Sequence, residues 1–307
     1  SAPTGTASAA AAPPPSSPAA WQTRALAGVP VAAVIDPASK DLVVLTGPGG
    51  SANTVTVLGR GTERTIALPA GATALAGDGP GRVVASTRGG YLSVDLAAGT
   101  ATRTDIAGRH DTDFTAIGRR GDGRLVLGGA DGSVFVLGSP TTVEYQDKPV
   151  SRVDSLVTQG DTTIVLDRAQ TSVTAVTAEG AAKQSLRAGE GATTMAIDAA
   201  GRVLVADTRG EELLVFGADP LILRQRYPVR EAPYGVTGSP GLVWVSQTAA
   251  NAVIGYDLAT GIPVEKVRYP TVQQPNLLAF DDASQTLYVV SGSGAGVQVI
   301  EHAGPPR

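Results

Sequence analysis

A histidine and two aspartates in one short stretch of the sequence could do chemistry. His110, Asp111 and Asp113 offer an imidazole and two carboxylates within residues 110–113. Such groups can hold a divalent cation, but three of them in a loop are common, and further ligands would have to come from distant parts of the chain. We therefore expect no bound metal and no cofactor, and no catalytic residue is identified.

Two arginines could hold an anionic group. The guanidinium groups of Arg152 and Arg230 can each donate two parallel hydrogen bonds to a carboxylate or a phosphate. Other polar residues at similar places in the pattern described below could join them; they are Glu190, Glu231, Tyr234, Gln273, Gln274 and Asn276. These residues are far apart in the sequence, so only the fold can bring them together.

Residues 192–225 show the elements that would position these side chains. They contain four short runs of apolar or alternating residues separated by turn residues, which predicts four antiparallel strands joined by hairpins. The second run recurs seven times at steps of 39 to 44 residues, at positions 43–45, 83–85, 125–127, 164–166, 203–205, 243–245 and 287–289. A period near 40 with four strands in each unit predicts an all-β fold, a seven-bladed β-propeller of four-stranded antiparallel blades.

The two ends of the repeat region complement each other. Residues 21–27 match the fourth-strand segments, such as residues 63–68, yet no earlier strand of a blade precedes them. The last repeat has three strands and lacks the fourth. We therefore expect residues 21–27 to pair with the strand around residues 297–300, which closes the ring and removes an exposed sheet edge.

In a propeller, the loops from the fourth strand of one blade to the first strand of the next converge at one end of the central channel. Those loops carry the polar residues introduced above: His110, Asp111, Asp113, Arg152, Glu190, Arg230, Glu231, Tyr234, Gln273, Gln274 and Asn276. The equivalent loops near residues 29–30 and 69–72 are apolar. We expect a lopsided polar pocket at the channel mouth for a small anionic or sugar-like ligand or an acidic partner loop; ordinary solvation of the mouth is the alternative.

Six aspartates fall in the hairpins between first and second strands. Asp stabilises such turns through bonds to the backbone, so we expect a structural role for Asp36, Asp78, Asp122, Asp161, Asp198 and Asp281.

Residues 1–20 contain only Ala, Pro, Ser, Thr and Gly. A segment of this composition cannot bury enough apolar surface to offset its ordering entropy, which predicts a disordered tether before a single propeller domain at residues 21–307. The chain starts at Ser1 rather than Met, and Ser1 could follow a lipidated cysteine. We therefore expect an extracytoplasmic, lipid-anchored protein of the cell envelope.

Composition excludes several classes of function. The chain has no cysteine, which excludes disulfides, thiolate metal sites and cysteine nucleophiles. A net charge of −4 without a basic stripe argues against nucleic-acid binding. No apolar run reaches the roughly 20 residues that span a bilayer, so membrane contact is expected only through the lipid anchor. We expect a monomer.

Two stretches carry a resemblance to known repeats. Residues 205–216, VADTRGEELLVF, resemble the NHL-type propeller repeat, and residues 244–267, WVSQTAANAVIGYDLATGIPVEKV, resemble the YVTN-type repeat of exported propellers. Over residues 21–301 the chain looks like a secreted actinobacterial propeller lipoprotein with seven blades. The resemblance implies a fold more than an activity, because propellers host binding modules, hydrolases, lyases and dehydrogenases alike.

Two functions from different classes remain. We favour a binding or scaffolding module that presents its polar channel mouth to an envelope protein, a glycan or a small anionic ligand. The alternative is a metal-dependent hydrolase or lyase acting at the same place, so whether the protein is an enzyme stays open.

Overall fold

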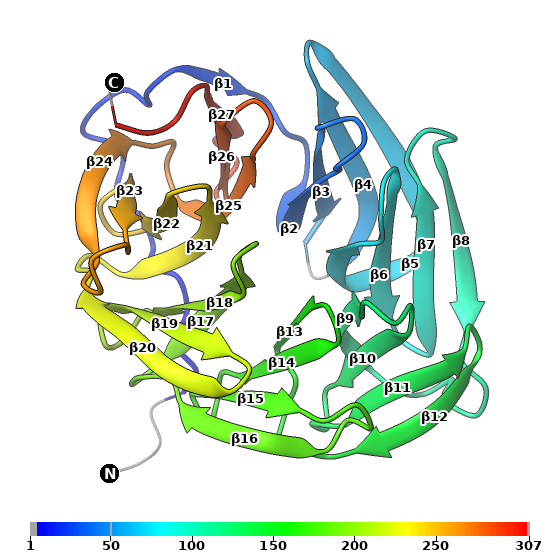
Figure 1. The fold of residues 1–307 in the computed structure, drawn as a ribbon. Helices are drawn as coiled ribbons and strands as arrows, with labels where there is room; N and C mark the ends of the chain where they lie inside the picture. Colours follow the sequence, from blue (N-terminus) through cyan, green and yellow to red (C-terminus); the bar gives the residue numbers. More distant parts are fainter. Residues whose placement is uncertain (1–4, 50, 306–307) are drawn as a thin grey trace. The chain divides into compact units, whose positions relative to one another are not determined.

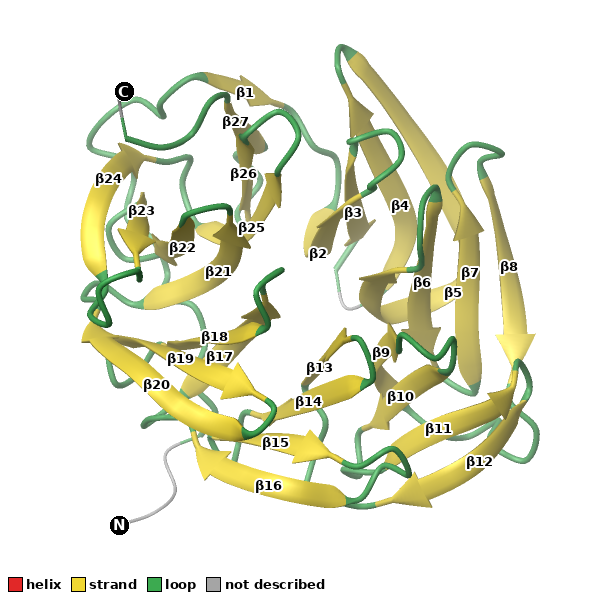
Figure 2. Ribbon diagram, viewed as in Figure 1, coloured by secondary structure: helices red, strands yellow, loops and turns green. Residues whose placement is uncertain are grey.

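The computed structural model describes residues 5–49 and 51–305. Every regular element in these residues is a β-strand, as Figure 2 shows, so the predicted all-β fold is confirmed. The described chain contains no helix long and apolar enough to cross a membrane.

The chain forms two compact units. Unit 1 comprises the described residues up to Ala27, Arg168–Val173, and the described residues from Leu186 onward. Unit 2 comprises Gly28–Asp167 and Thr174–Ser185.

The first blades of unit 2 share one seven-stranded antiparallel sheet, and the third blade is a separate four-stranded sheet. The strands of the large sheet are β2 (Val29–Ile35), β3 (Leu42–Gly47), β4 (Ala52–Gly59), β5 (Thr62–Gly77), β6 (Arg82–Thr87), β7 (Gly90–Asp95) and β8 (Thr100–Asp105). Those of the third blade are β9 (Phe114–Arg119), β10 (Leu125–Gly129), β11 (Val134–Ser139) and β12 (Thr142–Asp147).

Four further four-stranded sheets complete the fold, and the strands of the fourth blade have residues in both units. The fourth and fifth blades comprise β13 (Ser155–Gln159), β14 (Thr162–Asp167), β15 (Ser172–Val176), β16 (Ala182–Arg187), β17 (Ala192–Ile197), β18 (Arg202–Asp207), β19 (Glu212–Ala218) and β20 (Leu221–Pro228). The sixth and seventh comprise β21 (Pro233–Ser239), β22 (Leu242–Gln247), β23 (Ala252–Asp257), β24 (Val264–Pro270), β25 (Pro275–Asp281), β26 (Thr286–Ser291), β27 (Val297–Ile300) and β1 (Gln22–Arg24).

The long strand β5 joins the first two blades. Its first half pairs with β4 and its second half with β6, and Ala72 is a partner of both Ala52 and Thr87. Residues 69–72, for which the sequence suggested an apolar loop, therefore lie inside a strand. A Cβ atom at Gly71 would lie 2.1 Å from the Ser51 hydroxyl oxygen, so a larger residue there would require the Ser51 side chain to rotate.

The seven recurring runs all lie in the second strands, β3, β6, β10, β14, β18, β22 and β26. Successive residues of a strand point to opposite faces, yet Val203, Leu204 and Val205 of β18 are each 0% exposed. Both faces of such a strand are therefore covered. In unit 1, Leu204 and Val215 share a core cluster with Val243 of the next blade.

The N-terminal strand completes the last blade, as predicted. β1 pairs antiparallel with β27, with Gln22 opposite Val299 and Arg24 opposite Val297, and Figure 1 shows the two strands side by side. Counting β5 in two blades, the sheets make seven blades of four strands. The chain is a β-propeller closed by its N-terminal strand.

Four of the six hairpin aspartates, Asp36, Asp122, Asp198 and Asp281, bond to the backbone of their own turn as predicted, whereas Asp78 pairs with Arg119 and Asp161 is exposed. Asp36 is 3% exposed and accepts hydrogen bonds from the backbone of Ala38 and Ser39, the Ser39 hydroxyl and the backbone of Gly81. Asp281 binds its own turn in the same way. Because Gly81 belongs to the next blade, Asp36 also ties two hairpins of unit 2 together.

The Asp36 carboxylate makes stability depend on pH. Burial raises its pKa, but hydrogen bonds from Gly81, Ser39 and Ala38 outweigh burial and hold the pKa of Asp36 below its ordinary value of 3.8. The contribution of the carboxylate is therefore fully present above about pH 4 and is lost as the pH falls through the folded-state pKa.

We expect Asp36→Asn to lower the free energy of unfolding by about 1–3 kcal/mol at pH 7, and the deficit to shrink below pH 4. Urea unfolding at pH 7 and pH 2.5 measures both quantities. Asp161→Asn, at an exposed hairpin aspartate, should change neither. A deficit that is the same at both pH values would contradict the assignment.

Removal of β1 should destabilise the last blade. A chain that starts at Gly28 leaves the backbone of β27 without its outer partner, whereas one that starts at Trp21 keeps the pairing. We expect the shorter chain to melt roughly 5–15 °C below the longer one, from the loss of several backbone hydrogen bonds. Equal melting temperatures in calorimetry would show that β1 does not close the blade.

Candidate functional site

The predicted site residues fall in both units. Unit 2 holds His110, Asp111, Asp113 and Arg152; unit 1 holds Glu190, Arg230, Glu231, Tyr234, Gln273, Gln274 and Asn276.

The unit 2 residues make exposed local contacts. His110 Nε2 lies 3.2 Å from an Asp111 carboxylate oxygen, with the two side chains 88% and 89% exposed. Arg152 Nε donates to Asp154 over 3.1 Å. Exposed pairs of this kind contribute little to stability. Within the described residues, no group of three or more His, Asp and Glu side chains is placed to hold a metal ion.

Polar side chains at the ends of second strands position the predicted loops. The last residue of the second strand and the fourth-to-first loop lie at the same end of the sheet. The side chain of that last residue can therefore reach the loop. In four blades it bonds to that loop's backbone; the residues are Asp167, Asp207, Gln247 and Ser291. In the second blade, Thr87 donates instead to the Gly71 carbonyl inside β5.

Asp207 is the most heavily bonded of these residues. Its fully buried carboxylate accepts from the backbone of Glu190, Gly191 and Gly210. Burial raises the pKa of neighbouring Glu212, and a hydrogen bond between Glu212 and Asp207 raises it further. The loop that carries Glu190 is therefore held by the buried carboxylate of Asp207.

An N-terminal segment of the chain lies across these loops in unit 1. We call residues 5–13 the strap; it begins the blue part of the chain in Figure 1. Arg209 donates to the Gly5 carbonyl oxygen, and Arg168 donates to the Ala7 carbonyl oxygen. Both arginines belong to loops between second and third strands.

Gln274 holds two residues of the strap at once. Its Nε2 donates to the Ala10 carbonyl oxygen over 2.7 Å, and its Oε1 accepts from the Ala12 amide over 2.9 Å. Thr248 Oγ1 accepts from the Ala10 amide over 3.1 Å, and Gln273 Nε2 donates to the Ala12 carbonyl over 3.1 Å. The amide of Gln274 thus imitates a neighbouring strand.

Asn251 completes the set by donating to the Pro13 carbonyl over 2.8 Å. We call the surface made by the six side chains the strap site; its residues are Arg168, Arg209, Thr248, Asn251, Gln273 and Gln274. All their bonds to the strap go to its backbone. These bonds therefore do not depend on the side chains of the segment that is held.

The strap also fits closely. Ala7 is 7% exposed, and a Cβ atom on Gly191 would lie 2.9 Å from the Ala7 methyl carbon. A glycine at position 191 therefore leaves room for a small side chain at position 7. Composition predicted a disordered tether for residues 1–20. The bonds of the strap use backbone groups, which composition does not reveal.

Three predicted residues meet at the strap site. Gln273 and Gln274 bind the strap, and Gln274 Nε2 also donates to Asn276 Oδ1 over 2.9 Å. Arg230 and Glu231 belong to the adjoining fourth-to-first loop, whose backbone bonds to Gln247 and Thr248. Tyr234 lies at the start of β21, the strand that follows this loop.

That adjoining loop has free side chains and a strained backbone. Within the described chain, the side chains of Arg230, Glu231 and Tyr234 make no hydrogen bond or ion pair. Glu231 and Ala232 in this loop have φ angles of 64° and 57°, a region that residues other than glycine seldom adopt. Gln274 of the strap site lies in the same region, with a φ angle of 58°. Strain of this kind concentrates at ligand sites.

Sequence reasoning missed Arg168, Arg209, Thr248 and Asn251. All lie in loops between second and third strands, which read as ordinary polar turns. Topology could have identified them. In an antiparallel blade the second-to-third loops lie at the same end of the sheet as the fourth-to-first loops, so polar residues of both kinds of loop are candidates for one site.

Comparisons with known proteins show the fold. No family model and no curated protein matches the sequence. Among solved structures, a streptogramin B lyase matches with a TM-score of 0.74 at 12% identity, covering 91% of this chain and 97% of that one. A chain of the mitotic checkpoint complex matches with a TM-score of 0.74 at 10% identity, covering 93% and 91%.

A third match is the extracellular domain of a protein described as a one-component system from B. thetaiotaomicron. It has a TM-score of 0.68 at 12% identity and covers 91% of this chain and 41% of that one. At such identities these matches support the β-propeller fold, which the three proteins use in different settings.

Loss of the Gln274 side chain should loosen the strap. Gln274→Ala removes the acceptor of the Ala12 amide and a donor to Ala10, each worth about 0.5–1.5 kcal/mol. Together the two bonds are worth about 1–3 kcal/mol, so we expect hydrogen exchange of residues 10–12 to become roughly five- to 150-fold faster. The matched variant Gln285→Ala, at an exposed glutamine, should leave exchange there unchanged, and equal rates in both variants would contradict the assigned contacts.

Proposed function

We propose that this protein is an extracytoplasmic binding module that holds an extended polypeptide at the strap site. The observation that supports this is the bonding of six side chains, from four loops, to backbone atoms of the strap. Every polypeptide offers the same backbone groups, so a partner segment can replace the strap. Among the ligands expected from the sequence, this geometry favours a protein.

Specificity would come from the adjoining loop. Arg230 and Glu231 are exposed and charged, and Tyr234 adds a phenol, all without partners among the described residues. They can read side chains of a partner while the strap site reads its backbone. Peptide recognition commonly divides the work in this way.

The cellular setting belongs to the same proposal. Residues 21–307 act as one monomeric domain in the cell envelope, and the polar, uncharged composition of residues 1–20 suits a connection to a lipid anchor. The enzymatic alternative draws on the likeness to a streptogramin B lyase, which is a likeness of fold. The strap contacts favour binding.

A peptide titration tests the proposal. The peptide is the strap itself, residues 5–13 with a fluorescent label, and the receptor is the chain without residues 1–18. We expect saturable binding, and at least tenfold weaker binding to the full chain, because a covalently attached strap competes at an effective concentration in the millimolar range. Fluorescence anisotropy measures both affinities.

Two controls separate backbone recognition from unspecific adhesion. Methylation of the Ala12 amide nitrogen removes the hydrogen that Gln274 accepts, and it should weaken binding about tenfold or more. Replacement of Ala11, which is exposed, by serine should be tolerated. No binding to the shortened chain, or equal affinities of the methylated and unmethylated peptides, would refute the proposal.

A further inference from the structure

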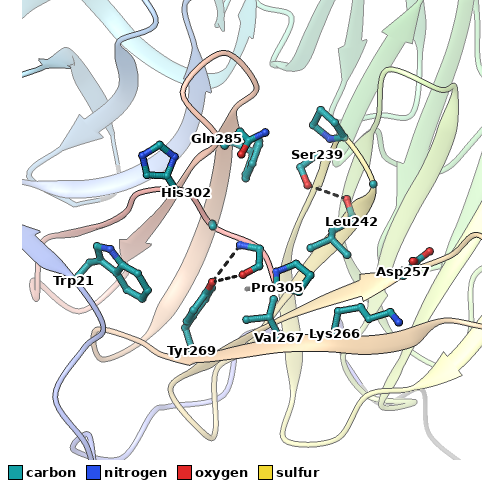
Figure 3. Close-up of a pocket in the computed structure, with 15 residues that line it drawn as sticks. Trp21, Ser239, Leu242, Asp257, Lys266, Val267, Tyr269, Gln285, His302 and Pro305 are labelled. Atoms are coloured by element: carbon teal, nitrogen blue, oxygen red, sulfur yellow. Dashed lines mark hydrogen bonds between the residues drawn. The ribbon is translucent and has the colours of Figure 1, made fainter. Parts of the chain in front are cut away.

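Unit 1 contains a cavity that the proposed function does not use. Its volume is about 1010 Å³, at the upper end of the range for small-molecule sites. Its wall comprises the β21–β22 hairpin around Ser239, the strand β24, residues 302–305 after β27, and Trp21 (Figure 3). The hairpin lies at the opposite end of β22 from Thr248, so the cavity is separate from the strap site.

Aromatic rings form one side of the cavity. The ring centres of Trp21 and Tyr269 lie 5.3 Å apart with planes at 81°. Tyr269 stacks on buried Trp244 at 6.1 Å, and Trp244 stacks on Phe280 at 6.3 Å. Trp21, Tyr269 and Phe280 line the cavity, and Figure 3 shows Trp21 and Tyr269 adjacent at its wall.

Trp21 combines a largely exposed side chain with a backbone conformation that is rare for a large residue. It is 54% exposed, and its φ angle of 59° is an outlier for a bulky residue. Its neighbours fix this geometry: the Ala20 amide donates to the Pro270 carbonyl over 3.1 Å, and Gln22 pairs with Val299. Backbone strain that presents an exposed indole to a cavity points to a bound ligand.

The C-terminal segment completes the wall. The Tyr269 hydroxyl donates to the Gly304 carbonyl, and the Gly304 amide donates back to the same hydroxyl, each over 3.1 Å. Figure 3 draws both bonds. Pro305 is thereby held opposite Lys266 and Val267. The cavity has a defined shape because these bonds fix the segment.

Free polar groups surround the rings. Lys266, Gln285 and His302 line the cavity, and their side chains make no hydrogen bond or ion pair with any other described residue. Asp257 adds a carboxylate that accepts from the Ala259 amide. The rim therefore offers an ammonium group, an amide, an imidazole and a carboxylate, with charges of both signs.

We propose that this cavity binds a neutral oligosaccharide. A sugar ring presents apolar C–H faces that pack on exposed aromatic rings, and hydroxyl groups at its edge that bond to isolated donors and acceptors. The rim carries both signs of charge, which disfavours a strongly charged ligand. Its separate polar side chains also differ from the paired amide contacts with which the strap site holds a peptide.

Tryptophan fluorescence gives a direct test with the full chain. The protein has two tryptophans, Trp21 exposed at the cavity and Trp244 buried behind Tyr269, so a ligand-dependent change in emission that Trp21→Phe removes reports Trp21. The probes are maltotetraose and tetra-N-acetylchitotetraose. We expect at least one to shift the emission saturably with a Kd of about 0.1–1 mM, an affinity typical of exposed, wet sites. No shift with either sugar up to 20-fold above that range, about 20 mM, would overturn the proposal.

Variants locate the binding by calorimetry. Trp21→Ala should abolish it, Trp21→Phe should retain part of it, and His302→Ala and Lys266→Ala should each weaken it about threefold or more. Tyr145→Ala, a change at an exposed tyrosine in unit 2, should have no effect. Melting temperatures show whether each variant is folded. If Trp21→Ala does not fold, His302→Ala and Lys266→Ala still test the proposal.

Two further outcomes separate this site from the strap site. The chain without residues 1–18 keeps Trp21 and should bind the sugar unchanged, whatever the result of the strap-peptide titration. A proline-rich peptide that shifts Trp21 emission when neither sugar does would assign the cavity to a peptide and overturn the proposal. If sugar binding is unchanged in all four variants at Trp21, His302 and Lys266, the sugar binds elsewhere and the proposal is also overturned.

Discussion

Burial of the second strand of each blade on both faces is the constraint on which the rest of the structure depends. A strand such as β18 is apolar at consecutive positions, so it needs a neighbouring sheet on each side. Because that strand is buried, its last residue is fixed at the end of the sheet where the fourth-to-first loops lie. Asp207 and Gln247 are such last residues, and they form hydrogen bonds with the backbone of these loops. The same packing that forms the core therefore positions the strap site.

Much of the fold could be predicted because it depends on side chains with a regular pattern. The buried runs recur near a period of 40, and the spare strand at residues 21–27 has one possible partner. The strap could not be predicted in this way. Its binding uses backbone carbonyl and amide groups of Gly5, Ala7, Ala10, Ala12 and Pro13, which do not depend on the identity of the side chain. Composition describes side chains, so it predicted disorder.

The candidate site was predicted in part for a related reason. Gln273, Gln274 and Asn276 could be predicted because they lie at a fourth-to-first connection, and the propeller topology places these connections at one end of the channel. Arg209 and Asn251 look like turn residues, and their roles depend on the path of a segment more than 190 positions away. The cavity beside Trp21 depends on two chain ends that meet at Tyr269, a proximity that no local pattern records.

The chain between the two proposed sites is short and is fixed at one point. Gln298 is fully buried; it donates to the carbonyls of Ala20 and Pro270 and accepts from the Val272 amide. This contact holds the chain just before Trp21. A partner that displaces the strap would therefore free the chain only as far as Ala20, and the aromatic wall of the cavity would stay in place.

The shared strand β5 has a consequence for cooperativity. In most repeat folds each unit meets its neighbour through side chains alone, so one unit can open while the next stays folded. Here the first two blades share a continuous hydrogen-bonded backbone from β2 to β8. Unfolding that starts in either blade breaks the hydrogen bonds of β5 with β4 or with β6. It then disturbs the bonds on the other side of β5, because both sets belong to one strand. We therefore expect the two blades to unfold together, as one cooperative unit of seven strands.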